Sequence, residues 1–160
     1  MLIDGLESSY NNPDGLVDPG WEAGGSKFVA TNRLIVRNSS FHHNVGPGLW
    51  LDIDNRDFLI ELNTADDNTS CCLPSTSTPY SVASPGIMVE ISYNGIVRTN
   101  TVRRNGLSFP NWMWGSGILI AASGGTSLEV TGNTVEGNGD GITLAQQARG
   151  TGPYGSYLVQ

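Results

Sequence analysis

The sequence predicts an all-β chain that folds as a solenoid of about four to five coils with two corner insertions. The first observation is a six-residue segment, bounded by Asn or Ser, that occurs four times. The second is that each copy is followed by a Gly and by alternating apolar residues. The four segments are Ser39–Asn44, Asn63–Asn68, Asn100–Asn105 and Asn133–Asn138. A unit of this size cannot bury its own apolar face, so its copies must stack.

Two sets of strands are expected in each repeat, because apolar and polar residues alternate with the period of a β-strand. The strands aligned on the glycines are Gly25–Val29, Gly48–Asp54, Gly86–Ser92, Gly117–Ser123 and Gly141–Ala145. A second set precedes the segments, at Leu34–Val36, Phe58–Ile60, Ile96–Val97 and Leu128–Val130. The interval is 23 residues from Gly25 to Gly48 and 24 from Gly117 to Gly141, and insertions near residues 70–84 and 107–116 account for the longer intervals.

The alternating residues on one face are expected to fill the interior of the coil. They are Leu49, Leu51, Ile53, Ile87, Val89, Ile91, Ile118, Ile120, Ile142 and Leu144. The asparagines are expected to stack and to hydrogen-bond from coil to coil, since Asn tolerates left-handed backbone and carries both donors and an acceptor. One column would hold Ser39, Asn63, Asn100 and Asn133, and the other Asn44, Asn68, Asn105 and Asn138.

The Gly-Ile-x-Ile strands and the Asn-Thr-Val-x-x-Asn segments resemble the repeats of the pectin-lyase-like superfamily. The resemblance covers roughly residues 25–147 and implies a right-handed parallel β-helix. It does not settle the chemistry, because that superfamily includes lyases, hydrolases, epimerases, phage tailspikes and adhesins. Asp66-Asp67 invites comparison with the paired aspartates of polygalacturonases, but the pair falls on another face and the other motifs of that family are absent.

The chain is divided into a leading loop or cap over residues 1–24 and coils over residues 25–160. Residues 157–160 are expected to begin a strand that stops before its Asn segment, which suggests a piece of a longer protein. The adjacent Cys71 and Cys72 cannot form a disulfide framework; a vicinal disulfide, free thiols and a link to another chain all stay open.

The charge excludes several classes of partner. The net charge is −7 and Lys27 is the single lysine, so neither nucleic acid nor an anionic membrane is expected as a partner. No apolar run is long enough to span a bilayer. We expect an extracellular protein whose secretion signal lies outside this sequence.

The outward residues of the Gly strands are expected to form a site. Asp52 and Glu90 fall on neighbouring turns of one face, with Asp54 two residues further along, and close carboxyl groups divide into an acid and a base. We therefore interpret Asp52 and Glu90 as acid and base or nucleophile, with Asp54 positioning them. The residues expected to contact substrate are Lys27, Trp50, Met88, Ser92, Trp112 and Trp114.

Other interpretations of these residues stay open. The acids also fit a solvated face in which Lys27 balances Asp52, or a Ca²⁺ site; no other cofactor and no assigned metal ligand is expected. Trp112 and Trp114 also fit a cover over a bare edge of the coil. His42-His43 is not expected to bind metal, because adjacent side chains on a strand point to opposite faces.

The preferred function is a carbohydrate-active hydrolase or lyase that acts on a neutral or weakly charged polysaccharide. One alternative is a structural, filament-forming or adhesive subunit that associates head to tail through its open ends, where strand edges lack partners. Another is a glycan-binding module without catalysis, which would retain the tryptophans and tolerate loss of the acids.

Overall fold

The computed structural model describes residues 1–70, 83–108, 110–124, 127–146, 151–152 and 155–156. The expectations about Cys71 and Cys72, and about a strand over residues 157–160, lie outside these residues. Within them, the helical structure is one short 3₁₀ turn, η2 (Met113–Gly115). No helix of the described residues is long and apolar enough to cross a membrane.

Three parallel sheets of five strands each form the coil, so the predicted all-β solenoid is confirmed. Sheet A contains β1 (Leu2–Asp4), β4 (Ile35–Arg37), β7 (Leu59–Glu61), β10 (Ile96–Arg98) and β13 (Glu129–Thr131). Sheet B contains β2 (Glu7–Ser9), β5 (Ser40–His42), β8 (Thr64–Asp66), β11 (Thr101–Arg103) and β14 (Thr134–Glu136). Sheet C contains β3 (Ser26–Val29), β6 (Leu49–Asp52), β9 (Ile87–Glu90), β12 (Ser116–Ala121) and β15 (Asp140–Ala145).

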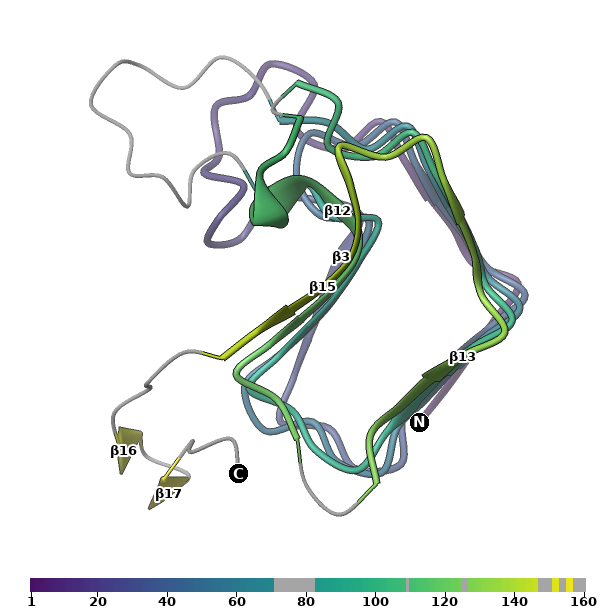
Figure 1. Cartoon of the computed structure of the whole chain (residues 1–160), viewed down its shortest axis with the longest axis vertical. Coiled ribbons are helices and arrows are strands. Elements are labelled where there is room, and N and C mark those ends of the chain that lie inside the picture. Colours follow the sequence, from purple (N-terminus) through teal and green to yellow (C-terminus); the bar gives the residue numbers. More distant parts are fainter. Residues whose placement is uncertain (71–82, 109, 125–126, 147–150, 153–154, 157–160) are drawn as a thin grey trace.

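Each coil contributes one strand to each sheet, and successive coils superpose when viewed down the coil axis (Figure 1). A separate antiparallel pair joins β16 (Thr151–Gly152) to β17 (Gly155–Ser156). Sheet B was not predicted. Its strands lie inside the Asn-bounded segments and have only three residues each, which is too short for the apolar-polar alternation of a β-strand to be recognised.

Residues 1–24, which were expected to form an entry loop or cap, contain two strands of the coil. Leu2 pairs with Ile35 in sheet A, and Glu7 pairs with Ser40 in sheet B. These residues therefore form most of a coil, and only the segment between β2 and β3 is a corner loop.

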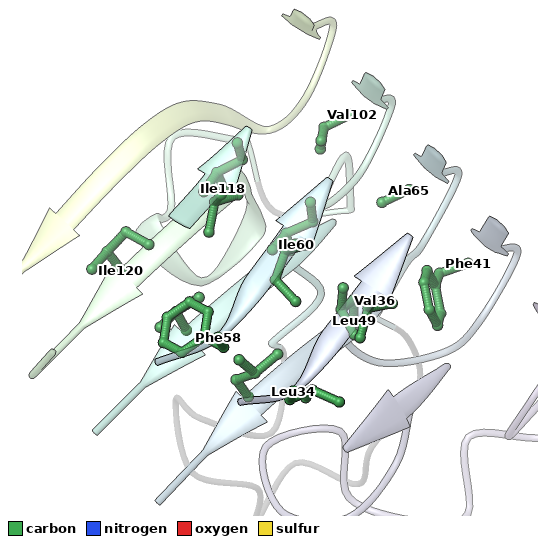
Figure 2. Packing of buried hydrophobic residues seen from close by; sticks show 14 residues of the cluster. Leu34, Val36, Phe41, Leu49, Phe58, Ile60, Ala65, Val102, Ile118 and Ile120 are labelled. Atoms are coloured by element: carbon green, nitrogen blue, oxygen red, sulfur yellow. The ribbon is translucent and has the colours of Figure 1, made fainter. Parts of the chain in front are cut away.

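The core lies between the three sheets, where apolar side chains from successive coils stack on one another (Figure 2). The fully buried members include Leu34, Val36, Phe41, Leu49, Leu51, Phe58, Ile60, Ile87, Val89 and Ile118. Among the predicted core residues, Ile142 and Leu144 of the fifth coil are instead exposed, at 51% and 76%. Of the described coils, none lies beyond β15 to cover them.

Both predicted Asn columns are confirmed as hydrogen-bonded ladders. In the second column the amide of Asn44 donates to Asn68 at 2.9 Å, and Asn68 donates to Asn105 at 2.8 Å. Each side chain also donates to a backbone carbonyl, as Asn68 does to Phe41 at 2.9 Å. The ladders satisfy buried polar groups at the corners, and this allows the backbone to turn inside the protein.

A third corner follows sheet C and contains the other departure from the predicted core. Ile53 and Ile91 adopt positive φ angles of 49° and 49°, which end the alternation of the strand. They form a separate apolar stack with Ala122 and Tyr93, instead of joining the main core.

The long loops leave the coil at one corner, between sheets B and C. In Figure 1 the early loop before β3 and the loop that contains η2 project from this corner on the same side. In the second coil the same corner is short, because only residues 43–48 separate β5 from β6. The short corner leaves the outer face of sheet C open between longer loops.

Candidate functional site

The floor of the candidate site is the outer face of β6 and β9. These strands pair in register, with Trp50 opposite Met88 and Leu51 opposite Val89. Asp52 and Glu90 follow at the ends of the same strands and therefore lie side by side, on backbones about 4.8 Å apart. Each is only 6% exposed. The predicted neighbourhood of these two carboxyl groups is thus present in the structure.

The walls come from the corner loops. A cavity of about 430 Å³ lies above the floor. It is lined by Asp18, Gly20, Trp21, Lys27, Trp50, Asp52, Ile53, Ala83, Met88, Glu90, Ile91 and Trp114. The first-coil loop forms one wall with Trp21, which is 70% exposed, and Trp114 forms part of the opposite wall. The cavity therefore occupies the gap left by the short corner of the second coil.

Lys27 contacts both the first-coil wall, at Trp21, and the floor, at Asp52. Its ammonium lies 3.0 Å from the Asp52 carboxylate and donates to the Trp21 carbonyl at 2.6 Å. The same nitrogen lies 3.9 Å from the ring centre of Trp50 and 5.7 Å from that of Trp21. These are cation–π distances. Asp52 is thus paired with Lys27 at the end of an aromatic surface.

An apolar cluster supports the floor from the loop side. Trp50, Met88 and Trp114 are almost fully buried and pack together with Ala83, Leu119 and Ala121. Trp112 is half-buried against this cluster and does not line the cavity. The two tryptophans of the insertion therefore differ, because Trp114 contributes to a cavity wall whereas Trp112 covers the outer face behind it.

Asp54 does not lie on the outward face beside Asp52 and Glu90, where the sequence analysis predicted it. The corner of the second coil contains one extra residue, so Asn55 occupies the stacked position and hydrogen-bonds to Thr31 and Ser92. Asp54 has a φ of 62° and accepts a hydrogen bond from Arg56 at 2.6 Å. This contact raises the pKa of the Arg56 guanidinium. Asp54 does not line the cavity, and we leave it out of the proposed site.

Ser92 is likewise a corner residue. Its side chain is fully buried, donates to the Glu90 carbonyl at 2.9 Å and accepts from Asn55 at 3.1 Å. Because the hydroxyl is engaged within the corner, Ser92 positions the backbone that follows Glu90. It is therefore not assigned a contact with substrate.

Sequence reasoning missed the first-coil wall. Asn11 ends a segment equivalent to the four repeats, since its backbone and side chain both donate to Asn44 at the first rung of the ladder. The sequence Pro19-Gly20-Trp21 also parallels Pro110-Asn111-Trp112 in the later insertion. These two signals together could have placed Trp21 in a corner loop beside the same face.

The geometry defines a parallel β-helix with a loop-walled cavity on the outside of one sheet. A family profile described as "Right handed beta helix region" matches residues 75–156, just over half of the chain. The chain therefore belongs to the right-handed β-helix family. Comparisons with curated proteins and with solved structures give no match.

Proposed function

We propose that this protein is a glycoside hydrolase that binds a neutral or weakly charged glycan in the cavity over sheet C. The observation behind this proposal is a pair of neighbouring, largely buried carboxyl groups, Asp52 and Glu90, on the floor of a cavity lined by tryptophans. Two carboxyl groups that flank the scissile bond are the usual machinery of glycoside hydrolysis.

The aromatic rim supports a sugar as the ligand. Trp21 presents most of its ring to solvent at the mouth of the cavity, and Trp50 and Trp114 line the interior. A flat apolar ring packs against the C–H face of a sugar, while the polar tip of the side chain stays available for a hydroxyl. The cavity volume also falls in the range of small-molecule sites, about 300–1,000 Å³.

The charge of the cavity favours hydrolysis of a neutral sugar over elimination in a uronic acid. The titratable lining residues are Asp18, Asp52 and Glu90 against the single cation Lys27. An anionic substrate would meet a site with an excess of negative charge, which opposes its binding.

The two acids are given different roles in this proposal. Asp52 is ion-paired with Lys27 and is the candidate base or nucleophile. Glu90 lines the same cavity from the neighbouring strand and is the candidate proton donor. Lys27 would hold Asp52 in place and Trp21 would bind the sugar.

A panel of neutral and uronic-acid polysaccharides tests the proposal. We expect release of reducing ends from at least one neutral glycan and no unsaturated product from any uronic-acid polymer, with chelator making no difference. Unsaturated products would show that the protein cleaves its substrate by elimination and not by hydrolysis. Binding of a glycan without turnover would instead identify a glycan-binding module, and the absence of both would contradict the proposal.

A further inference from the structure

A second cluster of titratable side chains lies on the outer face of sheet B, away from the cavity. His42 and His43 do not point to opposite faces as expected. Strand β5 ends at His42, and His43 turns with a φ of 55°, which breaks the alternation. The two imidazole rings therefore lie side by side, with centroids 5.1 Å apart and planes at 86°.

The nitrogens of the two rings face different partners. The two Nδ1 atoms face each other at 2.9 Å. His42 Nε2 lies 3.3 Å from a Glu7 carboxylate oxygen, and His43 Nε2 lies 3.9 Å from a carboxylate oxygen of Asp67. Tyr10 stacks on His43, with ring centroids 5.0 Å apart, and closes one side of the pair.

The contact between the two Nδ1 atoms depends on which nitrogen of each ring carries the proton. A carboxylate beside Nε2 favours the tautomer that carries the proton on that nitrogen, which leaves Nδ1 unprotonated. With both rings in this tautomer, two lone pairs would meet at 2.9 Å and repel each other. Either one ring carries its proton on Nδ1 and donates a hydrogen bond to the other, or a metal ion accepts both lone pairs.

The geometry points to a binding site for a divalent transition-metal ion, held by Nδ1 of His42 and Nδ1 of His43. Imidazole nitrogens bind such ions at about 2.0–2.1 Å. Two of them at right angles around one ion would be about 2.9 Å apart, the cis spacing of square-planar or octahedral geometry typical of Cu²⁺ and Ni²⁺. The separation of the two Nδ1 atoms matches this value.

The surrounding carboxylates complete the arrangement as outer ligands. Arg104 holds Asp67 beside His43 through two hydrogen bonds of 2.9 Å. Asp66 lies beside His42 in the sheet register, and its Oδ1 atom is shielded from solvent without a hydrogen-bond donor among the described residues.

The described residues include no cluster of three or more His, Cys, Asp or Glu side chains around one point. The site is therefore a two-imidazole site, in which water fills the remaining coordination positions. Cu²⁺ is the ion expected to bind most tightly, because it stands at the top of the affinity order for nitrogen ligands.

Titration with Cu²⁺ tests this site, with free thiols alkylated beforehand so that Cys71 and Cys72 do not compete. We expect one bound ion whose electron paramagnetic resonance spectrum shows two nitrogen ligands. The variant His43→Asn keeps a residue that tolerates positive φ. It is expected to weaken binding by at least about 10-fold, and Glu7→Gln by about 10-fold through loss of the outer ligand.

The control is Glu129→Gln, which removes an exposed carboxylate from sheet A and should leave Cu²⁺ binding unchanged. Unchanged Cu²⁺ affinity in His43→Asn would overturn the inference. So would a wild-type spectrum without nitrogen ligands, which would indicate that the two histidines hydrogen-bond to each other instead. The spectrum of the wild-type protein decides the question even if a variant folds poorly.

Discussion

Replacing Glu90 by Gln is expected to lower the rate of glycan hydrolysis by about 10²–10⁴-fold, the usual contribution of a general acid or base. The amide has the size of the carboxyl group but cannot deliver a proton to the leaving oxygen. The measurement is the release of reducing ends at saturating substrate, compared with the wild-type protein.

The loss of activity on substrates with different leaving groups distinguishes a catalytic role of Glu90 from a structural one. If Glu90 donates the proton, an aryl glycoside with a good leaving group needs less assistance, and Glu90→Gln should lose much less activity on it. Glu129→Gln, on the exposed side of sheet A, should behave as wild type. Equal losses on both substrates, together with a lowered unfolding temperature, would remove Glu90 from the chemistry.

Replacing Asn68 by Leu is expected to destabilise the fold by about 3–5 kcal/mol, in the range reached when a buried hydrogen-bond network is broken. The Asn68 side chain accepts from Asn44 through two hydrogen bonds, and donates to Phe41 and Asn105. Leucine has a similar size and leaves these partners buried without hydrogen bonds. Chemical denaturation measures the change in the free energy of unfolding.

Asn138→Leu is the matched control at the last rung of the same ladder. Asn138 is half-buried and has no further rung of the described ladder to donate to, so water can reach part of the groups left behind. We expect a cost of about 1–2 kcal/mol there. Equal costs at both positions would show that the ladder does not stabilise the coil through its buried hydrogen bonds.

The fold could be predicted because its signals are local and repeated. In the first four coils, the Gly at the start of the sheet C strand is required by packing: a Cβ on Gly48 would lie 2.6 Å from the Gly86 carbonyl oxygen and 2.7 Å from the Asn68 amide. Asn ladders and glycines therefore recur together at fixed spacing. The first coil carries only part of this signature, because its matching Asn is Asn11 and a long loop separates that residue from Gly25.

The site could be predicted only in part, for a similar reason. Asp52 and Glu90 lie within regular strands, where a period of two places them correctly. Asp54 lies at the corner, where one extra residue in the second coil shifts the register. Ser92 keeps its place in the stack, but its hydroxyl is engaged by Asn55 and by the Glu90 carbonyl. Trp21 was missed because it reaches the cavity through a loop, and loop conformation depends on contacts with distant residues such as Lys27.

Calorimetric titration of the Glu90→Gln variant with the oligosaccharides of an active glycan tests the central claim most directly, because binding can be measured without turnover. We expect heat of binding for at least one oligosaccharide, and an affinity at least about 10-fold lower when Trp21→Ala is added, since a stacking aromatic is lost. Adding Leu16→Ala instead, at another exposed position before β3, should leave the affinity unchanged. Binding that does not depend on Trp21, or no binding to any glycan, would contradict the assignment of this cavity to a sugar.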